Sequence, residues 1–201
     1  MLHRRLLLGA FALALTACAQ APTQRLAPTT QPLKSVRLYT WSNHDPALTG
    51  SGLDRFIGTL RGNGLEVRQA DALPRPLASL QALDAAWDQA PAATIATHAL
   101  VLTRQYEQSS QGTRYVRYEA VLWDPSTRKL VWLGTLASAA SFDPLRTGQV
   151  LITDADRRAE RLAGDLLRGL DRDSLFALSG KTPRDAKGGE IPPTLLPIDI
   201  R

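Results

Sequence analysis

The chain has 201 residues, of which 44% are hydrophobic and 21% charged, and its formal net charge is +5. This length is sufficient for one domain with a substantial core. There is no long block of like charge, so the charge pattern predicts no nucleic-acid partner. Cys18 is the only cysteine, which excludes a disulfide bond within the chain.

Residues 1–17 have the organisation of an export signal. Arg4 and Arg5 precede an apolar stretch from Leu6 to Leu15, and small residues lead to Cys18. The apolar stretch is too short to cross a bilayer of about 30 Å, which argues against a transmembrane anchor. The arginine pair also loosely resembles a twin-arginine signal, so general and twin-arginine export both stay open. We predict that residues 1–17 are a signal peptide.

The four residues Leu15-Thr16-Ala17-Cys18 resemble the lipobox of bacterial lipoprotein precursors. The resemblance implies that a diacylglyceryl group is attached to the sulfur of Cys18, and that Cys18 becomes the first residue and is often acylated on its amine. Two or three acyl chains would anchor the protein permanently to a membrane, and a lipidated sulfur cannot be a catalytic nucleophile. In a host that sorts lipoproteins as enteric bacteria do, Ala19 after the cysteine favours the periplasmic face of the outer membrane, but the sequence leaves inner and outer membrane both open. A conventional signal peptide with an incidental cysteine is the alternative.

Removal of residues 1–17 leaves 184 residues with 22 basic and 19 acidic side chains, so the net charge falls to +3. Residues 18–34 contain Pro22, Pro28 and Pro32 among threonine, glutamine and alanine. This composition predicts a lipid-anchored, proline-rich tether in an extended conformation.

Residues 35–178 are predicted to form a single α/β domain that opens with a strand at Val36–Trp41. A loop through Asn43–Pro46 leads to a helix capped by Ser51. Its apolar residues recur at i, i+3, i+4 and i+7, and Gly62–Gly64 ends it. A second strand at Leu65–Arg68 completes a right-handed β-α-β unit.

The rest of the domain is predicted to contain one short helix, three strands and one long helix. The short helix carries the apolar positions of Leu77–Trp87. The long helix is capped by Thr153 or Asp154 and reaches Leu170. Residues 179–201 are rich in glycine, proline and charge and predict a disordered tail, although its last apolar residues could dock. The strands are expected at Thr94–Glu107, Thr113–Trp123 and Lys129–Ala139.

The order of elements is therefore β-α-β-(α)-β-β-β-α. It predicts an α+β fold with a mixed sheet and helices packed on one face.

The last two strands form a hairpin with a turn that starts at Asp124. If Asp124 pairs with Lys129, Leu122 faces Val131 on an apolar side that we assign to the core. The opposite side then carries a candidate partner patch. Two interpretations stay open: a sheet face covered by other parts of the chain, or a docking surface. The patch consists of Trp123, Trp132, Leu130 and Val121.

Residues 118–134 resemble a hairpin, Asp-x-x-Thr-x-Lys-x-Val-Trp-x-Gly between two strands, that occurs in small lipoproteins of Gram-negative bacteria. Those proteins mostly consist of domains of unknown function. They share an early strand ending in Tyr-x-Trp, as Tyr39-Thr40-Trp41 does. The resemblance implies an α/β fold and an envelope location, and it supplies no catalytic residues.

The sequence offers few groups for catalysis. After export only two histidines remain, His44 and His98, and with no free thiol they make a poor metal site. His98 alternates with leucines, which predicts a buried or edge histidine and not a catalyst. His44 is followed by Asp45 in a loop after a strand, but Asp45-Pro46 is typical of a turn. We predict no metal, no cofactor and no catalytic residue. The acidic residues of the last helix interleave with arginines, which predicts a solvated, salt-bridged face.

Three functions remain open from the sequence. The first is a non-enzymatic lipoprotein of the bacterial cell envelope, bound to the membrane through lipid on Cys18, that acts as an adaptor or accessory subunit for an envelope protein. The second is a periplasmic carrier or sensor of a small apolar ligand such as a lipid, which would need a cavity near Phe56 and Leu166. The third is a hydrolase that uses His44. The sequence does not predict the oligomeric state.

Overall fold

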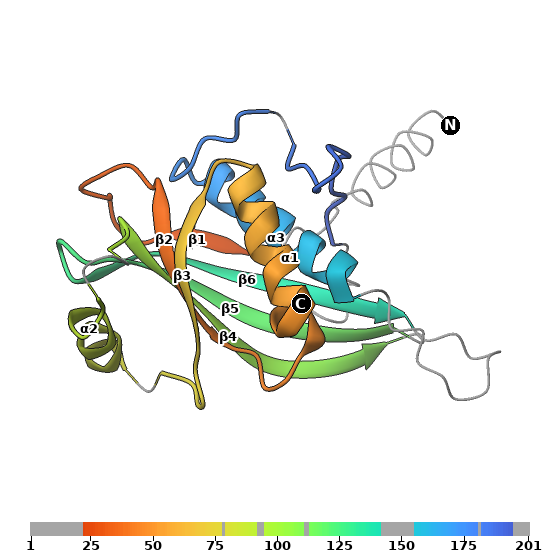
Figure 1. Cartoon of the computed structure of the whole chain (residues 1–201), viewed down its shortest axis with the longest axis horizontal. Coiled ribbons are helices and arrows are strands. Elements are labelled where there is room, and N and C mark those ends of the chain that lie inside the picture. Colours follow the sequence, from red (N-terminus) through yellow and green to blue (C-terminus); the bar gives the residue numbers. More distant parts are fainter. Residues whose placement is uncertain are drawn as a thin grey trace, which may run out of the picture.

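The computed structural model describes residues 22–77, 79–91, 95–110, 113–141, 155–180 and 182–194. In this part of the chain a six-stranded mixed sheet has the order β1-β6-β5-β4-β2-β3 and is accompanied by three α-helices (Figure 1). The predicted α+β class is confirmed. The elements are β1 (Thr23–Arg25), β2 (Ser35–Trp41), the 3₁₀ turn η1 (Pro46–Leu48), α1 (Gly50–Gly62), β3 (Glu66–Ala72), α2 (Leu80–Asp88), β4 (His98–Ser110), β5 (Thr113–Asp124), β6 (Lys129–Ser141) and α3 (Ala155–Arg172).

The β-α-β unit is formed by β2, α1 and β3, and its two strands are parallel. Helix α1 begins two residues earlier than predicted, so Thr49 rather than Ser51 occupies the N-cap position. After the helix, Gly64 has a φ angle of +92°, a conformation that glycine adopts without strain. Strand β3 continues to Ala72, beyond the predicted end at Arg68.

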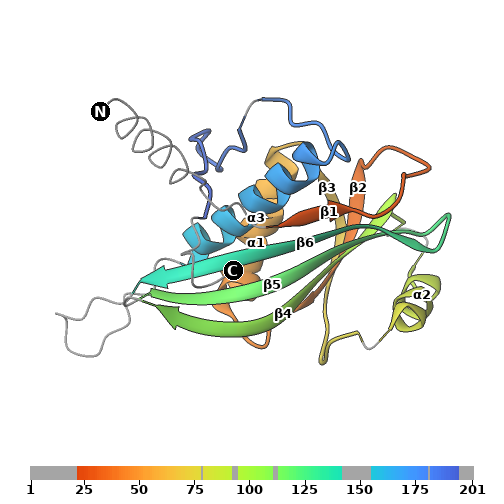
Figure 2. The ribbon, with the colours of Figure 1, turned by 180° about the vertical axis from the view of Figure 1, so that it is seen from behind.

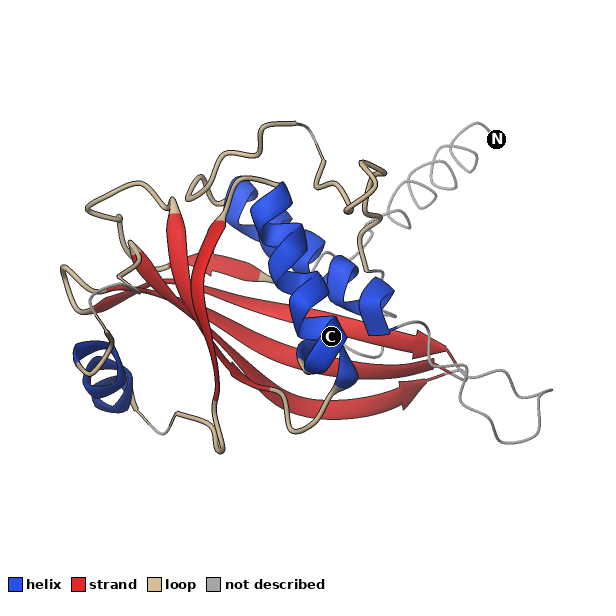
Figure 3. Ribbon diagram, viewed as in Figure 1, coloured by secondary structure: helices blue, strands red, loops and turns tan. Residues whose placement is uncertain are grey.

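The inner face of the sheet is the one that α1 and α3 cover (Figure 3). The apolar side of α1 contributes Phe56 and Leu60, and that of α3 contributes Leu162 and Leu166, all without exposed area. They pack with the inward residues of β2, β4, β5 and β6 in one large cluster. Burying a side chain of this size contributes about 1.5–3 kcal/mol, so this cluster is the main source of stability.

The outer face of the sheet is covered at one end by α2. Leu83 and Trp87 of this helix pack with Tyr39 and Trp123, and the two tryptophan rings meet edge to face with centroids 5.5 Å apart. The helices α1 and α3 follow the predicted arrangement, whereas α2 lies on the other face. The periodicity of its apolar residues predicts that the helix has an apolar side, but it does not specify which face of the sheet that side covers.

A β-bulge between Leu122 and Trp123 changes the predicted register of the hairpin. Leu122 faces Trp132 instead of Val131. The predicted pair of Asp124 with Lys129 is confirmed, and the predicted pairs from Leu122 onward are wrong by one residue. Because side chains alternate along a strand, β6 from Trp132 onward presents each side chain to the face opposite to the predicted one.

The N-terminal segment is part of the sheet. Thr23–Arg25 pairs antiparallel with β6, and the backbone N–H of Thr135 donates to the carbonyl of Pro22 at 3.0 Å. Leu33 is only 4% exposed in the core. The prediction that residues 18–34 form an extended tether is thus wrong from residue 22 onward, and residues 18–21 lie outside the described part.

The C-terminal segment 182–194 docks onto the helices. Ile191 is 4% exposed and packs against Gly164 of α3, while Arg168 donates to its carbonyl at 2.8 Å. The side chain of Asn63 exchanges two hydrogen bonds of 2.8 Å with the backbone of Arg184. The predicted disorder is therefore wrong for these residues. Residues 195–201, and the predicted caps Thr153 and Asp154, lie outside the described part.

Candidate functional site

The predicted patch is not a single exposed surface. Trp123 and Trp132 both have no exposed area and lie on opposite faces of the sheet. Trp132 is held in the inner face, where its Nε1 donates to Asp173 at 2.7 Å. A Cβ atom at Gly134 would overlap its ring, so the glycine is required for this packing. Val121 and Leu130 do lie on the outer face with Trp123, and they are half-buried.

Beyond α2, the outer face of β4, β5 and β6 carries a band of partly exposed side chains, which we call the outer strip. Figure 2 shows these strands in front, with α2 at one end. Tyr106 is 44% exposed, and the guanidinium of Arg117 lies 4.9 Å from its ring centroid. Strand register places Arg117 beside Tyr106, and Glu119 between Thr103 and Thr135. The strip consists of Thr103, Tyr106, Arg117, Glu119, Val121, Leu133 and Thr135.

A buried polar cluster joins α3 to the loop after β2. Arg158 donates to both carboxylate oxygens of Asp45 at 2.8 and 2.9 Å, and its Nε donates to Ser138 at 2.8 Å. The hydroxyl of Tyr118 donates to Asp45 at 2.7 Å, and the N–H of Ala47 donates at 2.9 Å. Each strong acceptor has a donor, so the cluster has the features of a structural lock.

The surroundings of these side chains determine whether any of them could act as a catalytic acid or base. Burial, followed by the negative charge of Asp45 and the hydrogen bond to it, raises the pKa of Tyr118 far above its ordinary value. Tyr118 is thus a neutral donor and not a base. Asp45 points into the core, whereas His44 is exposed and has a φ angle of +63°. The pairing of His44 with Asp45 that a hydrolase would need is not formed.

Asp124 forms a second polar cluster at the hairpin turn. Its Oδ2 accepts from the hydroxyl of Thr30 at 2.8 Å, and its Oδ1 accepts from the N–H and hydroxyl of Ser126 at 2.9 and 2.6 Å. Burial raises the pKa of Asp124, but these hydrogen bonds outweigh it and lower the pKa to about 2. The carboxylate therefore holds the N-terminal segment to the turn as an anion.

His98 is buried, as predicted, and has no exposed area. Neither ring nitrogen has a hydrogen-bond partner within the described residues. Burial lowers the pKa of His98, and the nearby Asp124 carboxylate opposes this only in part. His98 is thus a neutral core residue on the inner face.

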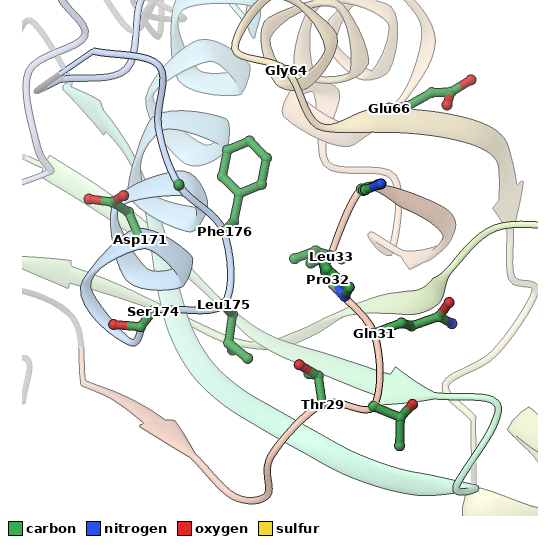
Figure 4. A pocket seen from close by; sticks show the side chains of 13 residues that line it. Thr29, Gln31, Pro32, Leu33, Gly64, Glu66, Asp171, Ser174, Leu175 and Phe176 are labelled. Carbon is green, nitrogen blue, oxygen red and sulfur yellow. The ribbon is translucent and has the colours of Figure 1, made fainter.

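A groove of about 990 Å³ runs between the segment 29–34 and the residues that follow α3. Figure 4 shows Phe176 on one wall and Leu33 with Pro32 on the other. Asp171 and Glu66 lie at its rim. The groove is distinct from the cavity expected near Phe56 and Leu166, because both of those side chains are fully buried in the core cluster.

Among the described residues, no three side chains of histidine, cysteine, aspartate or glutamate gather as a metal site would require. No helix in the described part of the chain combines the length and hydropathy needed to cross a membrane.

No known protein family and no curated protein matches the chain. Among solved structures, the PelC dodecamer from Paraburkholderia phytofirmans is similar, with 19% identity over 75% of this chain and 96% of that chain and a TM-score of 0.43. A point-substituted form of it has 19% identity over 74% of this chain and 96% of that chain, with a TM-score of 0.41. The hypothetical protein CT253 from Chlamydia trachomatis has 9% identity, coverage of 69% and 97%, and a TM-score of 0.38. At these values none of the similarities indicates a function for this chain.

Sequence reasoning missed Arg158 and the outer strip. Arg158 was grouped with the arginines of a solvated helix face, yet it stands four residues before Leu162 and eight before Leu166, on the apolar side of α3. That spacing was the available signal. For the strip, Tyr106 and Arg117 come into register only through a second bulge, between Arg104 and Tyr106, which no sequence pattern marks.

Proposed function

We propose that the protein is a non-enzymatic, lipid-anchored adaptor of the bacterial cell envelope that binds a protein partner through the outer strip. Lipid on Cys18 would hold it at a membrane, on the periplasmic face of the outer membrane. The motif Leu15-Thr16-Ala17-Cys18 supports the anchor. Anchoring a binder beside its target raises the effective concentration without adding contacts, so a modest interface suffices.

The observation that carries the proposal is the exposed Tyr106 with Arg117 packed on its ring. Tyrosine and arginine are among the residue types that contribute most to protein interfaces. Both stand on long paired strands, which hold them without help from a loop. Val121 and Leu133 add apolar area beside them, and Glu119 adds charge. This is the composition of a small interface with an aromatic anchor.

Photocrosslinking in the native envelope tests the proposal. A photoreactive residue at position 106 should capture one discrete envelope protein, because it lies in the strip. The same residue at Lys129, which is exposed on the hairpin turn, is the matched control. Arg117→Glu should abolish the captured band without changing the amount of protein. Equal capture from both positions would refute the strip as the binding surface.

Mass spectrometry of the mature N-terminus tests the anchor separately. A diacylglyceryl mass on Cys18 is the expected result. An unmodified cysteine, with the protein released from the membrane fraction, would overturn the lipoprotein assignment.

The groove beside Phe176 favours a second candidate, a carrier of a small apolar ligand. Its volume is within the range of small-molecule sites, and its walls include Leu33, Leu175 and Phe176. The fluorescent probe 1-N-phenylnaphthylamine should then bind with about one site per chain. Phe176→Ser should weaken the binding, whereas Tyr106→Ser should not. Probe binding that neither substitution weakens would exclude the groove as the binding site.

A further inference from the structure

The first residues that the structure describes limit the distance between the body and the proposed anchor. Pro22 is fixed on β6 by the hydrogen bond from Thr135. Cys18 is four residues before Pro22, and a fully extended chain spans at most about 3.6 Å per residue, or about 14 Å in total. If Cys18 is lipidated, as proposed above, this edge of the body lies close to the bilayer surface and is not held away on a tether.

The direction of β1 shows which side of the body is nearest. From Arg25 back to Pro22 the chain runs along β6 toward Ser138. Ser138 is bonded by Arg158, in the first turn of α3. The chain therefore points toward the N-terminal half of α3, which lies along β6, whereas the C-terminal half of α3 lies beside β1 (Figure 2).

An arginine stripe lies along α3, on the side opposite to its core residues Leu162 and Leu166. Positions 157, 161, 168 and 172 follow the helical spacings i, i+4, i+11 and i+15, so they share one side. Arg157 and Arg161 are exposed and form no ion pair with any residue that the structure describes. Arg168 is held by Asp165, and Arg172 contacts Thr23. The stripe thus begins beside the N-terminal strand, at Arg172, and ends in two exposed cations.

The acidic residues of α3 do not neutralise these two cations. Asp156 and Glu160 face α1, where Arg55 lies 3.5 and 3.7 Å from their carboxylates. From Gly169, which touches Thr23, the helix rises about 12 Å to Arg161 at 1.5 Å per residue. This distance is comparable to the reach of the anchor.

We propose that the arginine stripe of α3, led by Arg157 and Arg161, docks on anionic phospholipid headgroups beside the anchor. Guanidinium groups bind phosphates with paired hydrogen bonds, and a basic side chain near an anionic bilayer is attracted to it. The anchor and the stripe then act together and fix how the body is oriented. This orientation leaves the outer strip, on the opposite face of the sheet, turned toward a partner.

The test uses the mature lipidated protein with one introduced cysteine, Arg157→Cys, that carries a fluorophore. Lipidated Cys18 is the only other cysteine and cannot react. The protein is bound to vesicles of phosphatidylcholine alone or with phosphatidylglycerol, and acrylamide quenching is measured. Gln105→Cys, exposed on β4, is the reference position. Quenching at position 157 should fall about twofold or more in the anionic vesicles, and quenching at 105 should not change.

Charge reversal provides the matched pair. Arg161→Glu should remove the protection at position 157, because each basic side chain lost weakens docking about fivefold. Arg68→Glu makes the same change in charge on β3, at the opposite edge of the sheet, and should leave it intact. Protection that survives Arg161→Glu would overturn the proposal.

The remaining outcomes separate the two proposals. Equal quenching in both kinds of vesicle, with the protein still bound to them, would refute the docking and leave the anchor. Failure to bind phosphatidylcholine vesicles would refute the anchor and with it the docking. Protection found only in native membranes would assign the stripe to a protein partner and overturn the lipid proposal.

Discussion

Trp132 and Trp123 belong to one hairpin and are equally buried, yet their two faces of the sheet differ in construction. Trp132 on the inner face is enclosed by α3 and the N-terminal strand, and its ring N–H has an acceptor in Asp173. Trp123 on the outer face belongs to a smaller cluster with α2 and the segment before it, and its Nε1 has no hydrogen-bond partner in the described residues. The inner face is built for stability, whereas the outer face leaves most of its strands available for binding.

The largest effect should come from the two tryptophans. Trp132→Ala is expected to lower the free energy of unfolding by about 4 kcal/mol, because it removes a large ring and a hydrogen bond from a filled core. Trp123→Ala should cost about 3 kcal/mol or less, since the short helix α2 can move into the space. Urea denaturation of both variants measures the difference. A larger loss for Trp123→Ala would reverse the comparison of the faces.

The buried pair of Arg158 and Asp45 tests the inner face next. Arg158→Met should destabilise the protein by about 3 kcal/mol, because it leaves the Asp45 carboxylate buried without its cation. Adding Asp45→Asn should restore part of the loss, so the double variant costs less than the sum of the singles. A double-mutant cycle in urea gives the coupling. Strict additivity would contradict the lock.

Asp124 lies at the hairpin turn, and its substitution should have an intermediate effect on the free energy of unfolding. The folded protein holds the pKa of Asp124 at about 2, below its ordinary value of 3.8. Its contribution is therefore present above about pH 4 and is lost as the pH falls toward 2. Because the turn is near solvent, we expect about 1 kcal/mol from Asp124→Asn at pH 7. The variant should also have a flatter stability profile between pH 4 and pH 2, roughly where the carboxyl titrates.

His98 should matter little at neutral pH and more in acid. Its pKa in the folded protein is lowered from 6.5, so the unfolded chain takes up a proton first as the pH falls. Stability should therefore decrease below about pH 6.5. His98→Leu, which removes no hydrogen bond, should cost less than about 1 kcal/mol at pH 7.5. The midpoint temperature of thermal unfolding of His98→Leu should then differ less between pH 7.5 and pH 5 than that of the wild type.

The smallest change in stability is expected from the outer strip. Tyr106→Ala should alter the free energy of unfolding by less than about 0.5 kcal/mol, because the side chain is exposed and packs mainly on Arg117. Denaturation in urea checks this. A loss above about 2 kcal/mol would mean that Tyr106 supports the fold, and the contrast between the faces would fail.

The order of the elements could be predicted because helix periodicity and strand alternation report on burial, and the fold buries what those patterns predict. The bulge in the hairpin could not be predicted from the sequence, because both registers give an apolar inner face. Gly134 was the one indication, because a glycine within a strand often marks close packing.

The strand β1 was missed for another reason. Thr23–Arg25 carries no alternating apolar residues, and its place depends on backbone hydrogen bonds to β6 and on Asp124 holding Thr30. Composition alone therefore predicts an extended tether for residues 18–34. Arg158 was missed because a charged residue was assumed to be solvated, although its spacing placed it on the apolar side of α3.

The pairing of β1 with β6 joins residues 23 and 134. In a polypeptide that crosses a membrane from its N-terminus, as proposed, the first segment to emerge must wait until 111 further positions have followed before it can close the sheet. Pairing of β1 with β6 is thus a late step of sheet assembly, and it brings Thr23 beside Gly169 of α3.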